Sequence, residues 1–322
     1  MSNTRENNEM TTPFAVVSVD VGGTKIASAL MEYTSPEEKP RLLFKDIVPT
    51  LATEGGSAVL TRIKFIVAKM AETYGRPIAG VGIATAGRVN ANTGAIDFAN
   101  EIMPGWTGQP VAVEISKSAG VPCAVLNDVQ GHALGEARWG VAHGCSNCLM
   151  VAPGTGLGGS IIIDGKLLRG SRGFAGEIGH TFHPAAKGIP CSCGGEAHIE
   201  SIASGSGIEA QYVALGGEKL TGAEISTRAY EGEELAKRVI EEAGYALGES
   251  IATWVNMLDP EMIIISGSVV KAGSLWFDKL KEGFATQAPS TDTKIPIVEG
   301  ILGNDAPLYG AAEHACDTFN LR

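Results

Sequence analysis

Short apolar runs that end in acidic or glycine residues characterise the N-terminal part of the chain. Phe14–Val19 is a run of β-forming residues that stops at Asp20, and Ile26–Met31 is a second such run after a glycine-containing turn. This pattern predicts a β-hairpin. The apolar residues of Gly56–Tyr74 recur at helical spacing, and Ile78–Thr85 is typical of a buried strand, so a helix followed by a strand is expected.

A similar pattern begins again near Cys148. Leu149–Ala152 and Ser160–Ile163 predict two strands on either side of the glycine-rich turn Gly154–Gly159. Because the layout of strand, glycine turn and strand is repeated, we infer an internal duplication in which each half contributes one glycine turn to a shared cleft.

The remaining segments predict helices, short strands and one long loop. Residues 171–205 are rich in Gly, Ser and Cys and lack periodicity, which indicates a functional loop. Strands are expected at Cys123–Leu126 and Met262–Ile265, and helices at Val129–Trp139, 206–215, 222–230, 232–257 and at the end of Gly303–Ala315.

The order of these elements predicts an α/β protein of two domains. A chain of 322 residues exceeds one typical core, which takes roughly 100–200 residues. The hydrophobic share of 44% supplies enough apolar material to exclude disorder as the main state. We expect a disordered tail (1–13), a small α/β domain (14–125 plus 305–322) and a large α/β domain (126–304) that carries the loop 171–205.

Charge and hydropathy exclude two classes of partner. The chain has 25 Lys+Arg against 36 Asp+Glu, a net charge of −11, and no run of basic residues, so nucleic-acid binding is not expected. No apolar stretch approaches the ~20 residues of a membrane span. The polar N-terminus contains no apolar signal core, which predicts a cytoplasmic protein.

The 42 glycines cluster in loops between apolar runs, and two of these loops have the chemistry of phosphate sites. In Asp20–Lys25, two glycines allow backbone N–H groups to approach phosphate oxygens, Thr24 and Lys25 add donors, and Asp20 can hold Mg²⁺ or its waters. An ordinary hairpin turn is the alternative. Gly154–Gly159 is not a P-loop, and a β-branched run follows it instead of the helix of a dinucleotide site.

Asn127 and Asp128 follow an apolar strand and precede a helix, the position at which open α/β sheets place ligands. A carboxylate there can accept the proton of a hydroxyl that attacks a phosphoryl group. The alternative is a helix cap, a frequent role of Asp, and the spacing by itself favours capping.

His180, Cys191, Cys193 and His198 form the strongest cluster of metal-ligating residues. Two thiolates and two imidazoles within this short segment are a tetrahedral Zn²⁺ set, with His183 as a spare candidate. The alternative is buried inert thiols beside surface histidines. Cys145 and Cys148 form a second pair, but no further ligand lies near them in the sequence, which favours packing over a redox or zinc site.

Taken together, five motifs resemble the ROK family of sugar kinases and sugar-responsive repressors, over residues 15–315. They are Asp20-Val-Gly-Gly-Thr-Lys25, Leu126-Asn-Asp128, Gly154-Thr-Gly-Leu-Gly-Gly159, Gly176-Glu-Ile-Gly-His180 and Cys191-Ser-Cys-Gly-Gly-Glu-Ala-His-Ile-Glu200. The resemblance implies the two-domain actin-like ATPase (ribonuclease H-like) sugar kinase fold, with an active cleft between the domains. It also implies ATP-dependent phosphorylation of the 6-hydroxyl of a hexose.

Residue roles follow from the same resemblance. It makes Asp128 the general base, and it places the sugar near Asn127 and three further groups, Glu177, His180 and Glu200, with Asn100 facing the ring. The ATP and Mg²⁺ site would comprise Asp20, Gly22, Gly23, Thr24, Lys25, Gly154, Thr155, Gly156 and Gly158.

Two departures from the family pattern bear on cofactors. The family binds a structural Zn²⁺ through one His and three Cys, and here His198 stands at the third Cys position, so imidazole would replace thiolate. Zinc would then fix the loop that presents His180 and Glu200. Ser266-Gly267-Ser268 stands where the family has consecutive glycines beside the adenosine.

The choice of sugar rests on few positions. Gly87 and Arg88, within Gly87-Arg-Val-Asn90, together with Gln130 and Ile202-Ala-Ser-Gly205, look more like N-acetylmannosamine kinases, whereas Pro104-Gly-Trp106 is similar to glucokinases. N-acetylmannosamine is the first expectation and glucose the alternative.

Functions of other classes are also weighed. A sugar-sensing repressor of the family would carry a DNA-binding segment of many tens of residues, whereas about 13 polar residues precede the first strand here. A catalytically inactive sugar-binding module is opposed by Asp128 and both glycine turns. Relatives use polyphosphate in a few cases, which leaves the donor open, and are often dimers or tetramers, so a homodimer or homotetramer is expected.

Overall fold

The computed structural model describes residues 12–289 and 294–322, which fold into two compact units. Unit 1 contains the chain up to Gly135 and again Asn304–Arg322, and unit 2 contains Glu136–Gly303. Of the predicted tail over residues 1–13, only Thr12 and Pro13 are among the described residues.

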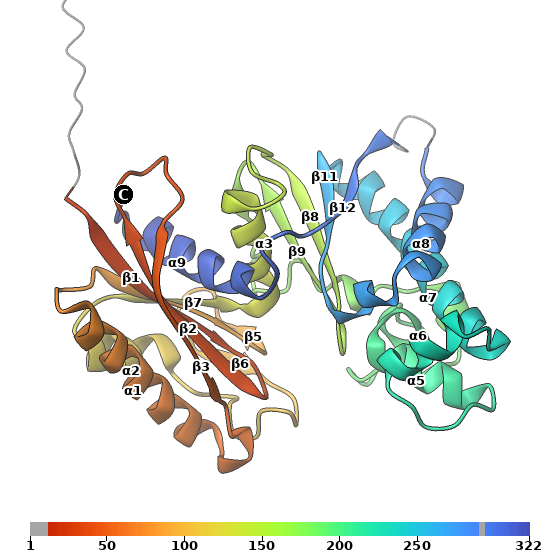
Figure 1. Cartoon of the computed structure of the whole chain (residues 1–322), viewed down its shortest axis with the longest axis horizontal. Coiled ribbons are helices and arrows are strands. Elements are labelled where there is room, and N and C mark those ends of the chain that lie inside the picture. Colours follow the sequence, from red (N-terminus) through yellow and green to blue (C-terminus); the bar gives the residue numbers. More distant parts are fainter. Residues whose placement is uncertain (1–11, 290–293) are drawn as a thin grey trace, which may run out of the picture. The chain divides into compact units, whose positions relative to one another are not determined.

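Unit 1 is built on a five-stranded sheet of order β3-β2-β1-β4-β7 (Figure 1). Its strands are β1 (Phe14–Val21), β2 (Lys25–Tyr33), β3 (Arg41–Pro49), β4 (Gly80–Thr85) and β7 (Cys123–Asn127). The pairs β1–β2 and β2–β3 are antiparallel, whereas β1–β4 and β4–β7 are parallel. In this register Val21 lies opposite Thr85, and Thr85 lies opposite Asn127. The carboxyl ends of β1, β4 and β7 therefore meet at one edge of the sheet.

Helices cover the unit 1 sheet, and a small two-stranded sheet completes the unit. The helices are α1 (Gly56–Tyr74), α2 (Val111–Ala119), the first part of α3 (Asp128–Trp139) and α9 (Ala306–Phe319); the small strands are β5 (Arg88–Val89) and β6 (Ile96–Phe98). Val17 and Val19 of β1 share a buried core with Ile63 of α1 and Ile115 of α2. Because side chains alternate across a strand, α1 and α2 cover one face of the sheet. On the other face, α9 packs against β1, β4 and β7.

Unit 2 repeats the sheet topology of unit 1. Its order is β10-β9-β8-β11-β12, formed by β8 (Cys148–Pro153), β9 (Leu157–Ile163), β10 (Lys166–Leu167), β11 (Met262–Ile265) and β12 (Ile297–Glu299). The pairs β10–β9 and β9–β8 are antiparallel, and the pairs β8–β11 and β11–β12 are parallel. The corresponding pairs of unit 1 have the same directions. The shared strand order and directions are those expected of a duplicated unit.

The helices of unit 2 form the second large core. They are α4 (Glu200–Ala203), α5 (Gly205–Ala214), α6 (Gly222–Tyr230), α7 (Glu234–Leu258) and α8 (Ser274–Gln287), with 3₁₀ turns η2 (Ile178–His180), η3 (Pro184–Ala186) and η4 (Ser268–Ala272). Leu149 and Ile263 of the sheet pack with Leu247 of α7 and Trp276 of α8. Gly248 permits close approach of these two helices, because a Cβ there would collide with the backbone of Leu280.

The structure moves one predicted domain boundary. We placed the start of the large domain at residue 126, whereas β7 pairs with β4 and the chain belongs to unit 1 as far as Gly135. The physical reason is that a strand and the first turns of its following helix pack as one piece, so the division falls inside α3. Among the strands and α-helices in the described part of the chain, the sequence pattern did not predict β3, β5, β6, β10, α2, α4, α8 and β12.

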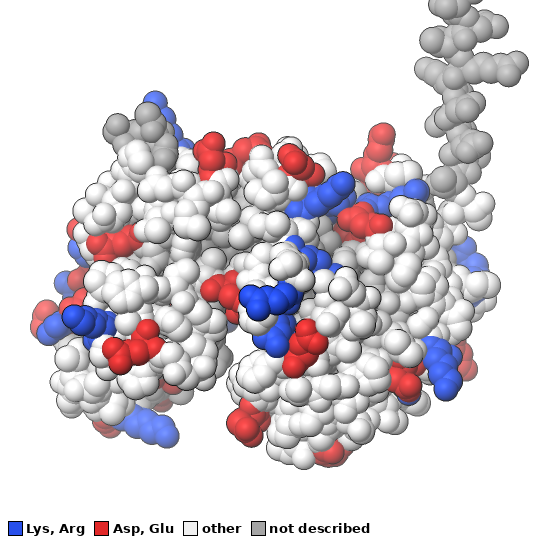
Figure 2. All heavy atoms as spheres, turned by 180° about the vertical axis from the view of Figure 1, so that it is seen from behind, with Lys and Arg blue, Asp and Glu red and all other residues white. Residues whose placement is uncertain are grey.

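Surface character agrees with the charge analysis. On the face shown in Figure 2, basic and acidic side chains are interspersed. Among the helices in the described part of the chain, none combines the length and apolar character needed to cross a membrane.

Candidate active site

The first glycine turn joins β1 to β2, which confirms the predicted hairpin. Thr50 fixes this turn: its hydroxyl donates to the carbonyl of Gly22 over 2.6 Å, and its backbone N–H donates to the carbonyl of Thr24 over 3.0 Å. Gly23 lies against the side chain of Ile102, and a Cβ on Gly23 would collide with it. The turn therefore has a fixed backbone and a closely covered glycine.

Asp20, directly before this turn, has an altered acidity. Burial is the largest cause of this shift and the negative charge of Asp128 adds to it, whereas Lys25 acts in the opposite direction; together they raise the pKa of Asp20 from 3.8 to about 7. Asp20 and Asp128 are thus close enough to repel each other, and a divalent cation would relieve that repulsion. The residues present fit the Mg²⁺ site that the sequence predicts at Asp20.

At the junction between β7 and α3, the side chain of Asn127 caps the helix. The side-chain oxygen of Asn127 accepts hydrogen bonds from the N–H groups of Val129 (2.9 Å) and Gln130 (3.4 Å), and its amide donates to the carbonyl of Gly87 over 2.9 Å. Asp128 shares the Val129 N–H, at 3.0 Å. Since Asn127 provides a cap, the helix start does not depend on the carboxylate of Asp128.

The other predicted sugar residues of unit 1 lie on adjoining segments. Gly87 has φ 93°, in the left-handed region, and a Cβ there would lie 2.6 Å from the carbonyl oxygen of Phe98. The guanidinium of Arg88 lies 6.0 Å from the centre of the Phe98 ring. Asn100 follows β6, and its side-chain oxygen accepts the N–H of Ile102 over 3.2 Å. Gly87, Asn127 and Asp128 are thus brought together, with Arg88 and Asn100 on the neighbouring hairpin.

A second glycine turn joins β8 to β9 in unit 2, as predicted, but it is shorter than the predicted Gly154–Gly159: β9 begins at Leu157, so the turn is Gly154–Gly156. The carbonyl of Gly154 accepts the Gly205 N–H over 2.7 Å, and the carbonyl of Thr155 accepts both the N–H (3.2 Å) and the hydroxyl (2.7 Å) of Ser206. The turn is therefore tied to the start of α5, and Gly158 continues into β9, paired with Ala152.

A cavity of about 480 Å³ opens beside this turn and lies wholly within unit 2. That volume is in the range of small-molecule sites. Its lining combines apolar side chains with hydroxyls and comes from the turn, α5, α6 and η4: Thr155, Gly205, Ser206, Ile208, Glu209, Thr221, Gly222, Ala223, Ser226, Thr227, Tyr230, Ile240, Ser268, Val269, Lys271 and Ala272. Of the predicted adenosine segment, Ser268 is among these residues. Sequence reasoning missed the α6 contribution, for which a small and polar helix face was the available signal.

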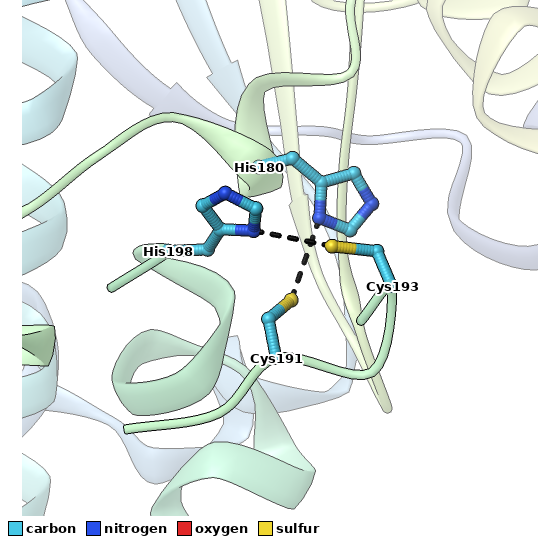
Figure 3. A group of neighbouring side chains, drawn as sticks. All are labelled: His180, Cys191, Cys193 and His198. Atoms are coloured by element: carbon cyan, nitrogen blue, oxygen red, sulfur yellow. Dashed lines mark hydrogen bonds between the residues drawn. The ribbon is translucent and has the colours of Figure 1, made fainter. Parts of the chain in front are cut away.

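The predicted metal ligands converge in the loop 171–205 (Figure 3). The ligand atoms of His180, Cys191, Cys193 and His198 all lie within 4.8 Å of one another. The distance from Cys191 Sγ to His180 Nδ1 is 3.6 Å, and that from Cys193 Sγ to His198 Nδ1 is 3.3 Å. A tetrahedral zinc site with ordinary bond lengths has S···N edges of about 3.6 Å. The four residues therefore fit Zn²⁺.

The two ring nitrogens of His180 face different groups. Its Nδ1 faces Cys191, whereas its Nε2 lies 3.9 Å from Glu177 Oε2. Glu177 precedes η2 and Glu200 begins α4. Both predicted sugar carboxylates therefore lie within the loop 171–205, the metal loop, on either side of the four ligands in the sequence. A ligating imidazole whose second nitrogen faces a carboxylate is a frequent metal-site arrangement.

His183, the spare candidate, and Cys148 of the second cysteine pair are not in this group. His183 is buried, its Nδ1 accepts the Ala185 N–H over 3.3 Å, and its Nε2 lies 3.3 Å from Glu249 Oε2. Burial lowers the pKa of His183. Through its contact with Glu249, His183 links the loop to α7. Cys148 is buried in β8, and burial raises the pKa of its thiol to about 12, which suits packing.

Known proteins match this chain over nearly its whole length. The model of the ROK family matches residues 16–317. The chain is 33% identical over 312 residues to a glucokinase of Halalkalibacterium halodurans, covering 91% of this chain and 92% of the relative. The crystal structure of a ROK hexokinase from Thermus thermophilus matches with a TM-score of 0.84 at 28% identity, covering 95% of this chain and 99% of that one.

A second structural relative was solved with ligands. It is a ROK family glucokinase from Streptomyces griseus in complex with glucose and AMPPNP, with a TM-score of 0.74 and 29% identity over 94% of this chain and 99% of that one. The two units have the two-domain actin-like ATPase fold of these sugar kinases. With the family model matched from residue 16 to residue 317, the chain belongs to the ROK family.

Proposed function

We propose that the protein transfers the γ-phosphoryl group of ATP to the 6-hydroxyl of a hexose. The observation that carries this proposal is the position of Asp128. It follows β7 at the sheet edge where β1 and β4 also end, it interacts with Asp20, and Asn127 provides the helix cap beside it. The similarity to a glucokinase over more than nine tenths of both chains supports the same reaction class.

In unit 1, Asp128 accepts the proton of the sugar hydroxyl as that oxygen attacks the phosphoryl group. Asn127 is fixed by its bonds to Gly87 and Val129 and orients the sugar beside the base. Asp20 holds Mg²⁺ or its waters. When bound with ATP, Mg²⁺ neutralises charge on the phosphates and lets Asp20 ionise next to Asp128.

In unit 2, the cavity beside Thr155 receives the nucleoside, and Gly154–Gly156 receives phosphate oxygens. Glu177, His180 and Glu200 bind hydroxyl groups of the sugar. The four-residue metal group holds a structural Zn²⁺ that keeps the loop carrying His180 in place. Phosphoryl transfer needs little covalent chemistry from the protein, so positioning and charge stabilisation are the main contributions of these residues.

Glucose is the substrate that the comparisons favour, because relatives of similar length at 29–33% identity are glucokinases. N-acetylmannosamine is the second candidate, on the resemblance of Gly87, Arg88 and Gln130. In the structure, Gln130 is buried and its side-chain oxygen accepts the Asn127 N–H over 3.3 Å. Gln130 would therefore influence the sugar through Asn127 rather than by direct contact.

The test is ADP release with Mg–ATP and, in turn, glucose, mannose, N-acetylglucosamine and N-acetylmannosamine. We expect glucose to lead by about tenfold in kcat/KM, about 1.4 kcal/mol of transition-state preference. A lead of the same size for N-acetylmannosamine would reverse the substrate assignment. The same assay with polyphosphate in place of ATP tests the phosphoryl donor.

Asp128→Asn tests the base. It should keep sugar affinity within several-fold and lower kcat by about 10²–10⁴, the usual contribution of a general base. Asp97→Asn, an exposed carboxylate of β6, is the matched control. Turnover retained in the Asp128 variant would contradict the assignment.

A further inference from the structure

The carboxylate of Glu200 contacts two segments that are far apart in the chain. Its Oε2 accepts the backbone N–H of Leu157, directly after the second glycine turn, over 2.9 Å. Its Oε1 accepts the hydroxyl of Ser192, in the metal loop, over 2.8 Å. One side chain therefore connects the end of the glycine turn to the metal loop within unit 2.

The turn side of this connection is tightly packed. A Cβ on Gly156 would lie 2.8 Å from Glu200 Oε2, so glycine lets the carboxylate approach the turn. On the other side, Gly179 of η2 lies so near the Leu157 carbonyl that a Cβ would collide with it. Leu157 is thus held both by Glu200 and by the segment that carries His180.

The loop side is set by the metal ligands. Ser192 stands between Cys191 and Cys193, whose sulfur atoms belong to the metal group. Cys191 Sγ itself lies 3.8 Å from the Glu200 oxygen that accepts the serine hydroxyl. When two cysteines are fixed by a common ion, the residue between them has little freedom, so the Ser192 hydroxyl is held at Glu200.

We propose that Ser192 is a positioning residue that couples the metal loop to the nucleotide turn through Glu200. Zinc in the loop holds Ser192, Ser192 holds the carboxylate of Glu200, and that carboxylate fixes the Leu157 N–H at the end of the turn. Zinc and nucleotide therefore bind cooperatively, and the coupling is the same in both directions. This inference rests on the proposed function in one respect, that Gly154–Gly156 receives the phosphates of ATP.

The experiment compares wild type with Ser192→Ala and with Ser201→Ala. Ser201 is the matched control, because its hydroxyl donates to the Pro190 carbonyl of the same loop over 3.1 Å rather than to Glu200. Each full-length protein is loaded with Zn²⁺, its zinc content is measured, and Mg–AMPPNP is titrated into it by calorimetry. The titration is repeated after a chelator has removed the zinc.

Wild type and Ser201→Ala should bind AMPPNP about five- to twentyfold more weakly without zinc, a typical size for coupled sites. Ser192→Ala should keep one zinc per chain and bind AMPPNP as weakly as zinc-free wild type does. Removing the zinc from this variant should lower its affinity for AMPPNP by less than about twofold. AMPPNP should slow zinc loss to a chelator in wild type but not in Ser192→Ala.

Wild-type coupling in Ser192→Ala would overturn the proposal, as would an equal loss in Ser201→Ala. In either case AMPPNP still binds, so the proposed function stands. Failure of AMPPNP to bind any zinc-loaded protein would overturn the nucleotide assignment and the coupling together. If zinc-free protein loses its helical circular dichroism, the comparison of the three zinc-loaded proteins decides.

Discussion

Asp20 lies at the end of β1, where burial and the charge of Asp128 raise its pKa from 3.8 to about 7. Between these two pH values the unfolded chain has lost the Asp20 proton and the folded protein still holds it. The free energy of unfolding therefore falls as pH rises through this window and stays low above it. Without Mg²⁺, ionised Asp20 is a destabilising residue at pH 8.

Asp20→Asn should remove this pH dependence. Asn cannot ionise, so the variant should melt several degrees above wild type at pH 8 and show little gain at pH 4, while its activity is lost. Thermal melts at both pH values without Mg²⁺ measure the effect. Asp46→Asn is the control of opposite sign, because the bond to Lys69 lowers the pKa of Asp46. An Asp20 variant that gains no more at pH 8 than at pH 4 would show that the carboxyl titrates normally.

At the scale of elements, periodicity predicts long amphipathic helices well. The expected segments 222–230 and 232–257 correspond to α6 (Gly222–Tyr230) and α7 (Glu234–Leu258), and Gly56–Tyr74 is α1. Burial of one helix face imposes a repeat on the sequence. Both glycine hairpins were also predictable, since each is a local motif with its turn residues between two β-forming runs.

Elements without a local signal escaped prediction. β3 is an edge strand whose side chains are half-buried or exposed, and Lys45 and Asp46 interrupt its apolar residues. β12 has three residues and is defined by its pairing with β11. The same reasoning applies to the site. The candidate metal ligands lie in one short segment and were predictable, whereas the lining of the proposed nucleoside cavity comes from separate segments that tertiary packing brings together.

Glu136 accepts hydrogen bonds from segments near both ends of unit 2, where the chain enters and leaves that unit. It begins unit 2, is fully buried, and accepts the N–H of Val141 through Oε2 (2.9 Å) and the N–H of Leu302 through Oε1 (2.7 Å). Leu302 is next to Gly303, the last residue of unit 2. Removing this buried carboxylate would leave the half-buried N–H groups of Val141 and Leu302 without this partner.

Glu136→Ala should therefore lower the free energy of unfolding by about 2–4 kcal/mol, as expected for charge-assisted hydrogen bonds lost in the interior. Urea unfolding followed by circular dichroism measures the change. Glu261→Ala is the matched control, because Glu261 also accepts two backbone N–H groups, of Ser146 and Asn147, but is exposed. Water can replace it there, so its loss should be about 1 kcal/mol or less. Equal losses in both variants would contradict a special role for the buried carboxylate.

At the scale of the whole molecule, two units of the same sheet topology have separate hydrophobic cores and carry different parts of the proposed site. The proposed base and the predicted Mg²⁺ ligand belong to unit 1, whereas the metal loop and the proposed nucleoside cavity belong to unit 2. Each core is continuous within its own unit. A perturbation confined to the metal loop should thus remain within unit 2.

Zinc removal tests this division by hydrogen exchange. Without the ion, backbone amides of residues 178–203 and of Leu157 should exchange about tenfold faster or more, since their protection depends on the loop, while β1 and α9 keep their protection. His198→Ala should show the fast pattern without chelator, because it lacks one ligand of the metal group. Cys145→Ser, outside that group, should respond as wild type does. Equally faster exchange in β1 and α9 would mean that the two cores open as one cooperative unit. Unchanged exchange at 178–203 would mean that the loop is held by its own packing, through contacts such as that of His183 with Glu249.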